Sequence, residues 1–180
     1  MEWVHGPKAE CNSKLAIQML ERMLASGFNK KTALELINSM LILKNDEDNF
    51  STIDMSVIDL YSGNIEFVKL SACPTFIKNK KGVQIVNSVS LPVGILKDVE
   101  IDLYDKNLEC GDIVVMVTDG VLDSKENIDK KELWLKDLIE NIDTTNPQRV
   151  ADIIIGEAID NNYGMAKDDM TVIVAKIIEN

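Results

Sequence analysis

The sequence predicts an α+β fold in one domain of 180 residues. Helical periodicity at both ends of the chain, a long run of short alternating segments between them, and connections of hairpin length lead to this prediction. Because hairpin loops join antiparallel strands, we expect antiparallel sheets and not a doubly wound parallel sheet. No repeat, low-complexity tract or linker divides the chain, which favours a single domain over residues 1–180.

The N-terminal part predicts two helices, at residues 8–26 and 30–43. Gly27 ends the first helix, and the short connection predicts that the two helices pack as an antiparallel pair. Their apolar faces consist of Leu15, Met19 and Met23 in the first helix and Leu34, Ile37 and Leu41 in the second. The charged segment that follows, residues 44–49, is expected to form a loop.

The middle of the chain predicts strands. In residues 50–63, Ile53, Met55 and Val57 alternate with polar residues, and the letters "YSGN" indicate a turn that leads into residues 65–71 as the hairpin partner. The other predicted segments are two short strands within 75–87 around a Lys-Lys-Gly turn, a loop at 90–96, a strand at 100–105 and the most apolar strand at 113–118.

The C-terminal part predicts helices at about 129–141 and 146–161, and a closing strand at 170–178. Pro147 marks the first turn of the second helix, where a proline lacks only an amide that would be unpaired in any case. The apolar positions of this helix have helical spacing and are Val150, Ile153, Ile154 and Ala158.

Composition narrows the possible functions. A net charge of −11 repels phosphate backbones and anionic lipid, so nucleic acid and membrane surfaces are poor partners. The single histidine, His5, argues against most zinc hydrolases and Ser-His-Asp enzymes, and three cysteines without a CxxC pair argue against a disulfide framework or zinc knuckle. No apolar run reaches the roughly 20 residues of a membrane span, and the start "MEWVHGPKAE" lacks a signal peptide's apolar region, so we expect a cytoplasmic protein.

Two places put carboxylates at the end of an apolar strand. Asp119 directly follows the strand at 113–118, and the Asp168–Asp169 pair directly precedes the strand at 170–178. A carboxylate that loses water at the end of a buried strand needs a cation or hydrogen-bond donors, and all-oxygen ligation favours magnesium or manganese over zinc. The plainer alternatives are an Asp-Gly turn at the first place and a solvated loop at the second.

Four stretches together closely resemble the phosphatase domain of the stage II sporulation protein E family, a branch of the metal-dependent type 2C serine/threonine protein phosphatases. These stretches are "FSTIDMSVIDLYSGNIEFVKLSACPTFIK" (50–78), "SLPVGIL" (90–96), "VTDGVLD" (117–123) and "KDDMTVIVAKI" (167–177). The resemblance covers nearly the whole chain. It implies an αββα sandwich, in which two antiparallel sheets pack face to face with helices outside.

The resemblance also implies a reaction, the hydrolysis of phosphoserine or phosphothreonine on a protein. Two Mn²⁺ or Mg²⁺ ions would activate a water molecule, so no side chain would form a covalent intermediate. Asp119 and Asp168 would be metal ligands, and Asp169 would orient the site. Gly120 would be a further residue around the ligands, and Asp123 would be structural. The phosphoprotein substrate would be an anti-anti-sigma factor, and full-length members of the family are membrane-anchored through segments upstream.

The family's first motif is incomplete in this sequence. The family opens its domain with a strand and Asp-Gly-Met-Gly-x-Gly-x-x-Ala, in which the Asp and the next Gly carbonyl hold the metals. Gly6 and Ala9 keep the register of this motif, but Met1 and Glu2 stand at the Asp and Gly positions. We therefore expect a domain truncated at its N-terminus, without the family's first strands.

Three functional hypotheses follow. The first is an active sporulation phosphatase, and the second is a catalytically impaired module of the same fold that still docks the phosphoprotein. The third is an interaction piece that forms a homodimer through helices 8–43, whose exposed apolar residues would include Met19, Met23 and Met40. The plainer interpretation of these methionines is that they fill the core.

Overall fold

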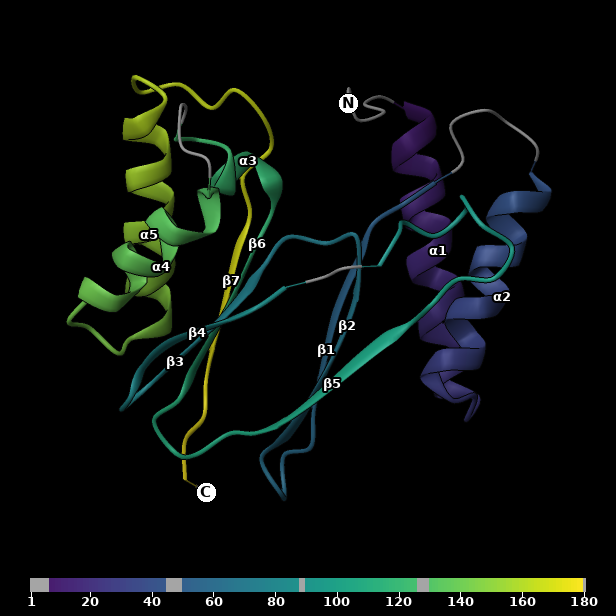
Figure 1. Ribbon diagram of the computed structural model, residues 1–180, viewed down its shortest axis with the longest axis horizontal. Helices are drawn as coiled ribbons and strands as arrows, with labels where there is room; N and C mark the ends of the chain where they lie inside the picture. The colour runs from purple at the N-terminus through teal and green to yellow at the C-terminus, as the bar shows by residue number, and fades with distance from the viewer. Residues whose placement is uncertain (1–6, 45–49, 88–89, 126–129, 180) are drawn as a thin grey trace. The chain divides into compact units, whose positions relative to one another are not determined.

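The described chain runs through two helices, six strands, three helices and a closing strand, close to the predicted order (Figure 1). The computed structural model describes residues 7–44, 50–87, 90–125 and 130–179. The elements are α1 (Pro7–Ala25), α2 (Lys30–Leu43), β1 (Ile53–Ile58), β2 (Asn64–Leu70), β3 (Thr75–Asn79), β4 (Gly82–Val86), β5 (Asp102–Asn107), β6 (Ile113–Val117), α3 (Asp119–Leu122), α4 (Lys131–Asn141), α5 (Pro147–Asn161) and β7 (Val172–Lys176). The α+β class and the two sheets are therefore confirmed.

The described chain divides into two compact units. One unit is built on α1 and α2, and the other contains the four-stranded sheet with α3, α4 and α5. The organisation of residues 1–180 as a single domain stays a prediction. In the described ranges, no helix combines the length and the apolar character that crossing a bilayer requires.

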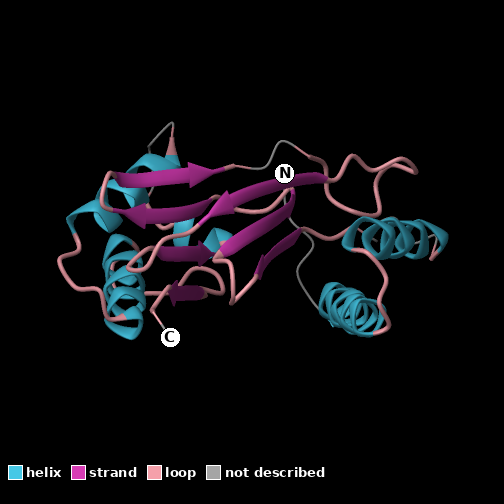
Figure 2. Ribbon diagram, turned by 90° about the horizontal axis from the view of Figure 1, so that it is seen from below, coloured by secondary structure: helices cyan, strands magenta, loops and turns pink. Residues whose placement is uncertain are grey.

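In the first unit, α1 and α2 pack side by side, as Figure 2 shows. Asn29 begins α2 by accepting a hydrogen bond from the Thr32 amide at 2.8 Å, which satisfies one of the free amides of the first turn. The buried core of this unit consists of Ala16, Leu34, Ile37, Leu41, Val68, Leu70 and Val93. Met19 and Met40 pack against that core, so for these two residues the structure favours core filling.

Buried Asn38 joins α2 to the loop predicted at 90–96. Its Nδ2 donates to the Leu96 carbonyl at 2.8 Å and to the Lys97 carbonyl at 3.2 Å, and its Oδ1 accepts from the Gly94 amide at 2.7 Å. The side chain thus gives hydrogen-bond partners to three backbone groups of this loop. Sequence periodicity gave no sign of this role, because Asn38 lies on the same helix face as apolar residues.

The three-stranded sheet has the order β1-β2-β5, and a tight turn joins its first two strands. One Asp59 oxygen, Oδ1, accepts hydrogen bonds from the Tyr61 amide at 2.8 Å and from the Ser62 amide at 3.3 Å, and the Asp59 amide donates to the Asn64 carbonyl. The amide of Tyr61, followed by the hydroxyl and amide of Ser62, holds the pKa of the Asp59 carboxyl below its ordinary value.

This turn should weaken only in strong acid. Because folding lowers the pKa of Asp59, the ionised carboxylate contributes stability above its unfolded pKa, and that contribution is lost as the pH falls through the lower folded value. We expect an NMR titration to place the Asp59 midpoint below the ordinary value of an aspartate carboxyl. Asp59→Asn should remove this part of the acid dependence. A midpoint at or above that ordinary value would contradict the prediction.

The four-stranded sheet has the order β4-β3-β6-β7, and every neighbouring pair is antiparallel. Helices α4 and α5 cover one face, where Trp134, Leu135, Ile139, Val150, Ile154 and Ala158 pack with Phe76, Val83, Ile113, Val115 and Val117 of the strands. Lys78 ties α4 to β3, since its Nζ donates to the carbonyls of Ile139 at 2.8 Å and Ile142 at 2.6 Å near the end of that helix. In this sheet β6 is an inner strand, and its neighbour β7 is the edge strand.

Some predicted boundaries were wrong. The strand predicted at 113–118 ends at Val117, and the strand predicted at 170–178 is confined to Val172–Lys176. Both corrections follow the pairing of the two strands, because their register runs from Ile113↔Lys176 to Val117↔Val172. The apolar sequence continues beyond that register only at Ile177 and Ile178, but a strand ends where its pairing ends. The loop predicted at 44–49 lies almost entirely outside the described residues.

Candidate metal site at the end of strand β6

The end of β6 turns directly into a short helix. Thr118 is extended (φ −87°, ψ 164°) and is the residue before α3, and Asp119 and Gly120 are the first two residues of that helix. The sequence left a simple Asp-Gly turn as the plainer alternative here, and that alternative is wrong because the two residues begin a helix. As a result, Asp119 lies at the beginning of a helix, where a negative charge is favoured.

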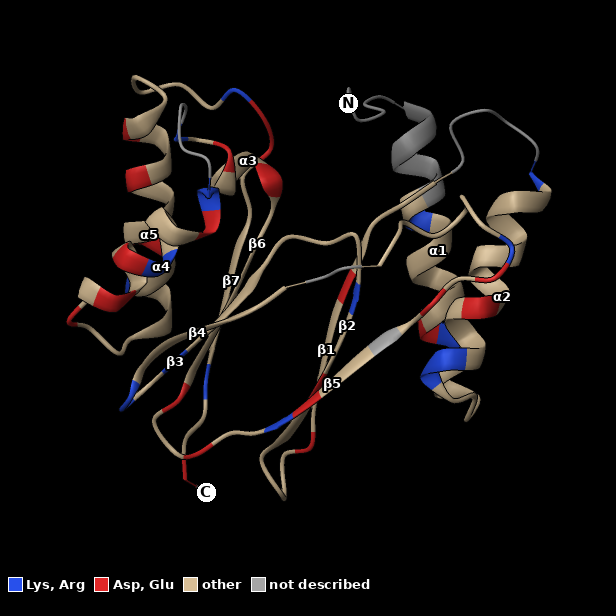
Figure 3. Ribbon diagram, in the orientation of Figure 1, with Lys and Arg blue, Asp and Glu red and all other residues tan. Residues whose placement is uncertain are grey.

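Gly120 brings the second carboxylate segment to this helix. A Cβ atom on Gly120 would overlap the Asp169 carbonyl oxygen and would lie 3.3 Å from the Asp168 carbonyl carbon. The backbone of Asp168–Asp169 thus passes against α3 with no space for a side chain between them. Figure 3 shows the same arrangement, with the acidic start of α3 beside acidic residues of the segment that leads into β7. The structure therefore brings together the two segments that the sequence singled out.

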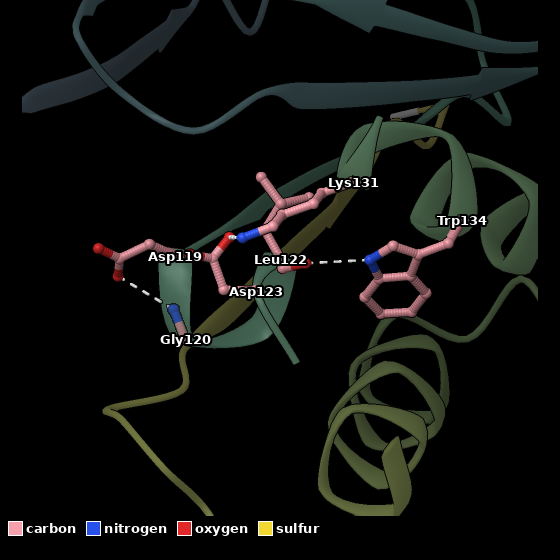
Figure 4. A network of polar contacts seen from close by, with 6 residues as sticks. All are labelled: Asp119, Gly120, Leu122, Asp123, Lys131 and Trp134. Carbon is pink, nitrogen blue, oxygen red and sulfur yellow. Dashed lines mark hydrogen bonds and ion pairs between the residues drawn. The ribbon is translucent and has the colours of Figure 1, made fainter. Parts of the chain in front are cut away.

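The carboxylates themselves are exposed. Asp119, Asp168 and Asp169 are all accessible to solvent, so the expected loss of water at a buried strand end is wrong. Asp119 Oδ1 accepts a hydrogen bond from the Gly120 amide at 3.0 Å (Figure 4), and Asp168 Oδ1 accepts one from the Asp169 amide at 2.8 Å. These local bonds leave both side chains open to a ligand from solution. In the described ranges, neither Asp119 nor Asp168 forms an ion pair with a lysine or arginine.

The donor chemistry fits a hard cation, but the described ligand set is small. Carboxylate oxygens are the ligands that Mg²⁺ and Mn²⁺ prefer in proteins. However, no cluster of three His, Cys, Asp or Glu side chains that could hold a metal ion occurs among the described residues. A complete site would need ligands from elsewhere or from water. Met1, Glu2 and Gly6 of the incomplete first motif lie outside the described residues, and Ala9 lies in the first turn of α1.

The other end of α3 is braced against α4 (Figure 4). Asp123 pairs with Lys131 at 2.9 Å, with 55% and 41% of the two side chains exposed, and the Trp134 indole Nε1 donates to the Leu122 carbonyl at 3.0 Å. Sequence reasoning missed Lys131 and Trp134. A tryptophan among predicted helix residues was the available signal, since a buried indole N–H requires an acceptor.

Comparison with known proteins adds family information to this geometry. The profile of the Stage II sporulation protein E (SpoIIE) family matches residues 5–178. Stage II sporulation protein E of Priestia megaterium is 35% identical over 176 residues, which are 98% of this chain and 30% of that protein. The chain therefore spans less than a third of the length of this curated relative.

Two solved structures are similar to the chain. The first is the PP2C phosphatase domain with a fragment of the regulatory domain of the cell fate determinant SpoIIE from Bacillus subtilis. It has a TM-score of 0.84 and 34% identity, over 92% of this chain and 50% of that one. The second is the manganese-presoaked phosphatase domain of the same protein, with a TM-score of 0.71 and 33% identity, over 92% and 74% of the two chains.

Proposed function

The chain belongs to the Stage II sporulation protein E (SpoIIE) family, and on this premise we propose that it hydrolyses phosphoserine or phosphothreonine on a protein with the help of manganese or magnesium. Family membership indicates a protein phosphatase. The proposal assigns that activity to the site at the end of β6. It also takes the substrate to be a phosphorylated anti-anti-sigma factor, following the resemblance described above.

One observation carries the proposal. The contact between Gly120 and the Asp169 backbone brings the Asp119 segment to the Asp168 segment, although the two lie about 50 residues apart in the sequence. Both carboxylates are exposed, and both are of the kind that hard cations prefer. We propose that Asp119 and Asp168 hold the metal, while Asp169 supports the segment through its backbone.

A bound metal of this kind supplies an activated water molecule and neutralises charge on the phosphoryl group. The chain's own residues would do the remaining work. Asp119 and Asp168 would bind and orient the cation, and α3 would hold Asp119 at its first position. The contact between α3 and the 168–169 backbone would set the spacing of the ligands.

Phosphate release from a phosphoserine protein tests the proposal. We expect manganese-dependent release by the wild-type chain and release at background level by Asp119→Asn and by Asp168→Asn, because each change removes a charged metal ligand. Asp137→Asn is the matched control, since Asp137 is an exposed aspartate on α4, and it should keep the wild-type rate. Wild-type rates in Asp119→Asn and Asp168→Asn would overturn the assignment of the site.

A second function is a binding module that docks the phosphoprotein without turnover. The observation in its favour is the lack of a three-ligand metal cluster among the described residues. Binding of the phosphorylated partner with no release of phosphate, in the presence of manganese, would support this alternative over the first. A chain that releases phosphate would exclude it.

A further inference from the structure

We propose that the hydroxyl group of Thr118 is a positioning group that holds the Asp168–Asp169 segment in register with Asp119. This inference deepens the proposed function and rests on it, since it concerns the same pair of carboxylates. It is carried by the hydrogen bonds of one side chain, which connects the residue before Asp119 with the residues that follow Asp168.

The Thr118 hydroxyl acts as donor and acceptor at once. Its Oγ1 donates to the Asp169 carbonyl at 3.1 Å and accepts from the Thr171 amide at 2.9 Å. The Thr118 amide also donates to the Thr171 carbonyl at 3.1 Å. Three hydrogen bonds therefore join one residue to the three-residue stretch from Asp169 to Thr171, directly after Val117 and Val172, the last paired residues of β6 and β7.

The hydrogen-bond partners of the Thr118 hydroxyl are unusual for a threonine that precedes a helix. A threonine before a helix commonly accepts a hydrogen bond from an amide in the first turn. Thr118 precedes α3 but forms no such side-chain cap. Its hydroxyl instead bonds to the backbone of Asp169 and Thr171. Its role therefore concerns that segment and not the start of α3.

These bonds act on the backbone that carries the second carboxylate. The Asp169 carbonyl is bonded by Thr118 and lies against Gly120, so it is confined from two directions. The carboxylates cannot provide this order themselves, because in the described chain the side chains of Asp119 and Asp168 bond only to the amides of the next residues. Thr118 therefore fixes the position of the backbone that follows Asp168 relative to Asp119.

The test uses three variants of the full chain. Thr118→Val keeps the branched shape and removes the hydroxyl group, whereas Thr118→Ser keeps the hydroxyl group. Thr171→Val is the matched control, because it makes the same chemical change at an exposed residue whose bonds to Thr118 come from its backbone. Two quantities are measured in each variant: amide hydrogen exchange at Thr171 without metal, relative to Ala175 of β7, which pairs with Val114 of β6, and manganese affinity by calorimetry.

We expect faster relative exchange at Thr171 in Thr118→Val and a fall in manganese affinity of about 10- to 100-fold, as is typical when a group that orients a metal ligand is removed. Thr118→Ser should restore both quantities nearly to the wild-type values. A general loss of stability would accelerate exchange at Ala175 as well, so the ratio separates positioning from unfolding.

Two results would overturn the inference. One is unchanged relative exchange at Thr171 in Thr118→Val, and the other is wild-type manganese affinity in that variant despite faster exchange. If the wild-type chain takes up no manganese, the proposed metal site fails, and the exchange comparison alone then decides whether the Thr118 hydroxyl holds the segment. Equal defects in Thr118→Ser and Thr118→Val would also count against the hydroxyl group.

Discussion

Gly120→Ala is expected to lower the free energy of unfolding by about 3 kcal/mol, at the upper end of the usual cost of overpacking, and to weaken manganese binding. The added methyl carbon would overlap the Asp169 carbonyl oxygen and would lie 3.0 Å from its carbonyl carbon. Both atoms belong to backbone, so no change of rotamer relieves the overlap. Either α3 or the Asp168–Asp169 segment must move, and the two carboxylates then separate.

The sign of this effect is opposite to helix propensity. Alanine is favoured over glycine inside a helix by about 1 kcal/mol, and Gly120 lies in α3. Gly156→Ala in α5 is the matched control, because a Cβ atom added there would meet no neighbouring segment within 4 Å, and the change should stabilise the chain. Denaturant unfolding and manganese titration of both variants provide the measurement. Equal or greater stability in Gly120→Ala would show that the close contact does not constrain this site.

Asp54→Asn is expected to lower the free energy of unfolding by about 3 kcal/mol, the cost typical of breaking a buried ion pair. Lys69 on β2 is fully buried, and its Nζ donates to Asp54 Oδ2 on β1 at 2.8 Å. The Asp54 side chain is only 19% exposed. Removing its charge leaves a buried ammonium group without this counter-charge, and solvation by water cannot replace it.

Two further variants test whether burial of the ion pair causes this cost. The pair Asp123–Lys131 has nearly the same length, 2.9 Å, but both partners are largely exposed, so Asp123→Asn should cost less than about 1 kcal/mol. In the double variant Asp54→Leu with Lys69→Met, most of the lost stability should return, since apolar residues of similar size often replace a buried pair without loss. Denaturant unfolding of the variants gives the free energies. A cost for Asp54→Asn no larger than that for Asp123→Asn would contradict the prediction.

Local patterns predicted which segments form helices and strands. The 3.6-residue period of residues 30–43 gave the bounds of α2, and the alternation within 50–63 gave β1 and its turn. Such patterns are local because they reflect which faces of one segment are apolar. The ends of β6 and β7 were not predictable in the same way, because a partner strand sets them.

For the candidate site, too, some features were predictable from the sequence and others were not. The motifs and the family resemblance identified Asp119, Asp168 and Asp169 as candidate site residues. The apolar patterns of the neighbouring segments placed these residues at the ends of predicted strands. The tertiary structure alone decided that these carboxylates are exposed and that Gly120 packs against the Asp169 backbone.

The residues that join distant parts of the chain had no sequence signal of their own. Thr118 and Asp169 are about 50 residues apart, and Asn38 reaches a loop more than 50 residues away. Such contacts depend on the register of paired strands and on which helix covers which loop. Local patterns and motifs therefore predicted the order of the elements, the fold class and the candidate carboxylates. How those carboxylates are held was not predictable from them, because hydrogen bonding and close packing between segments depend on the arrangement of those segments in space.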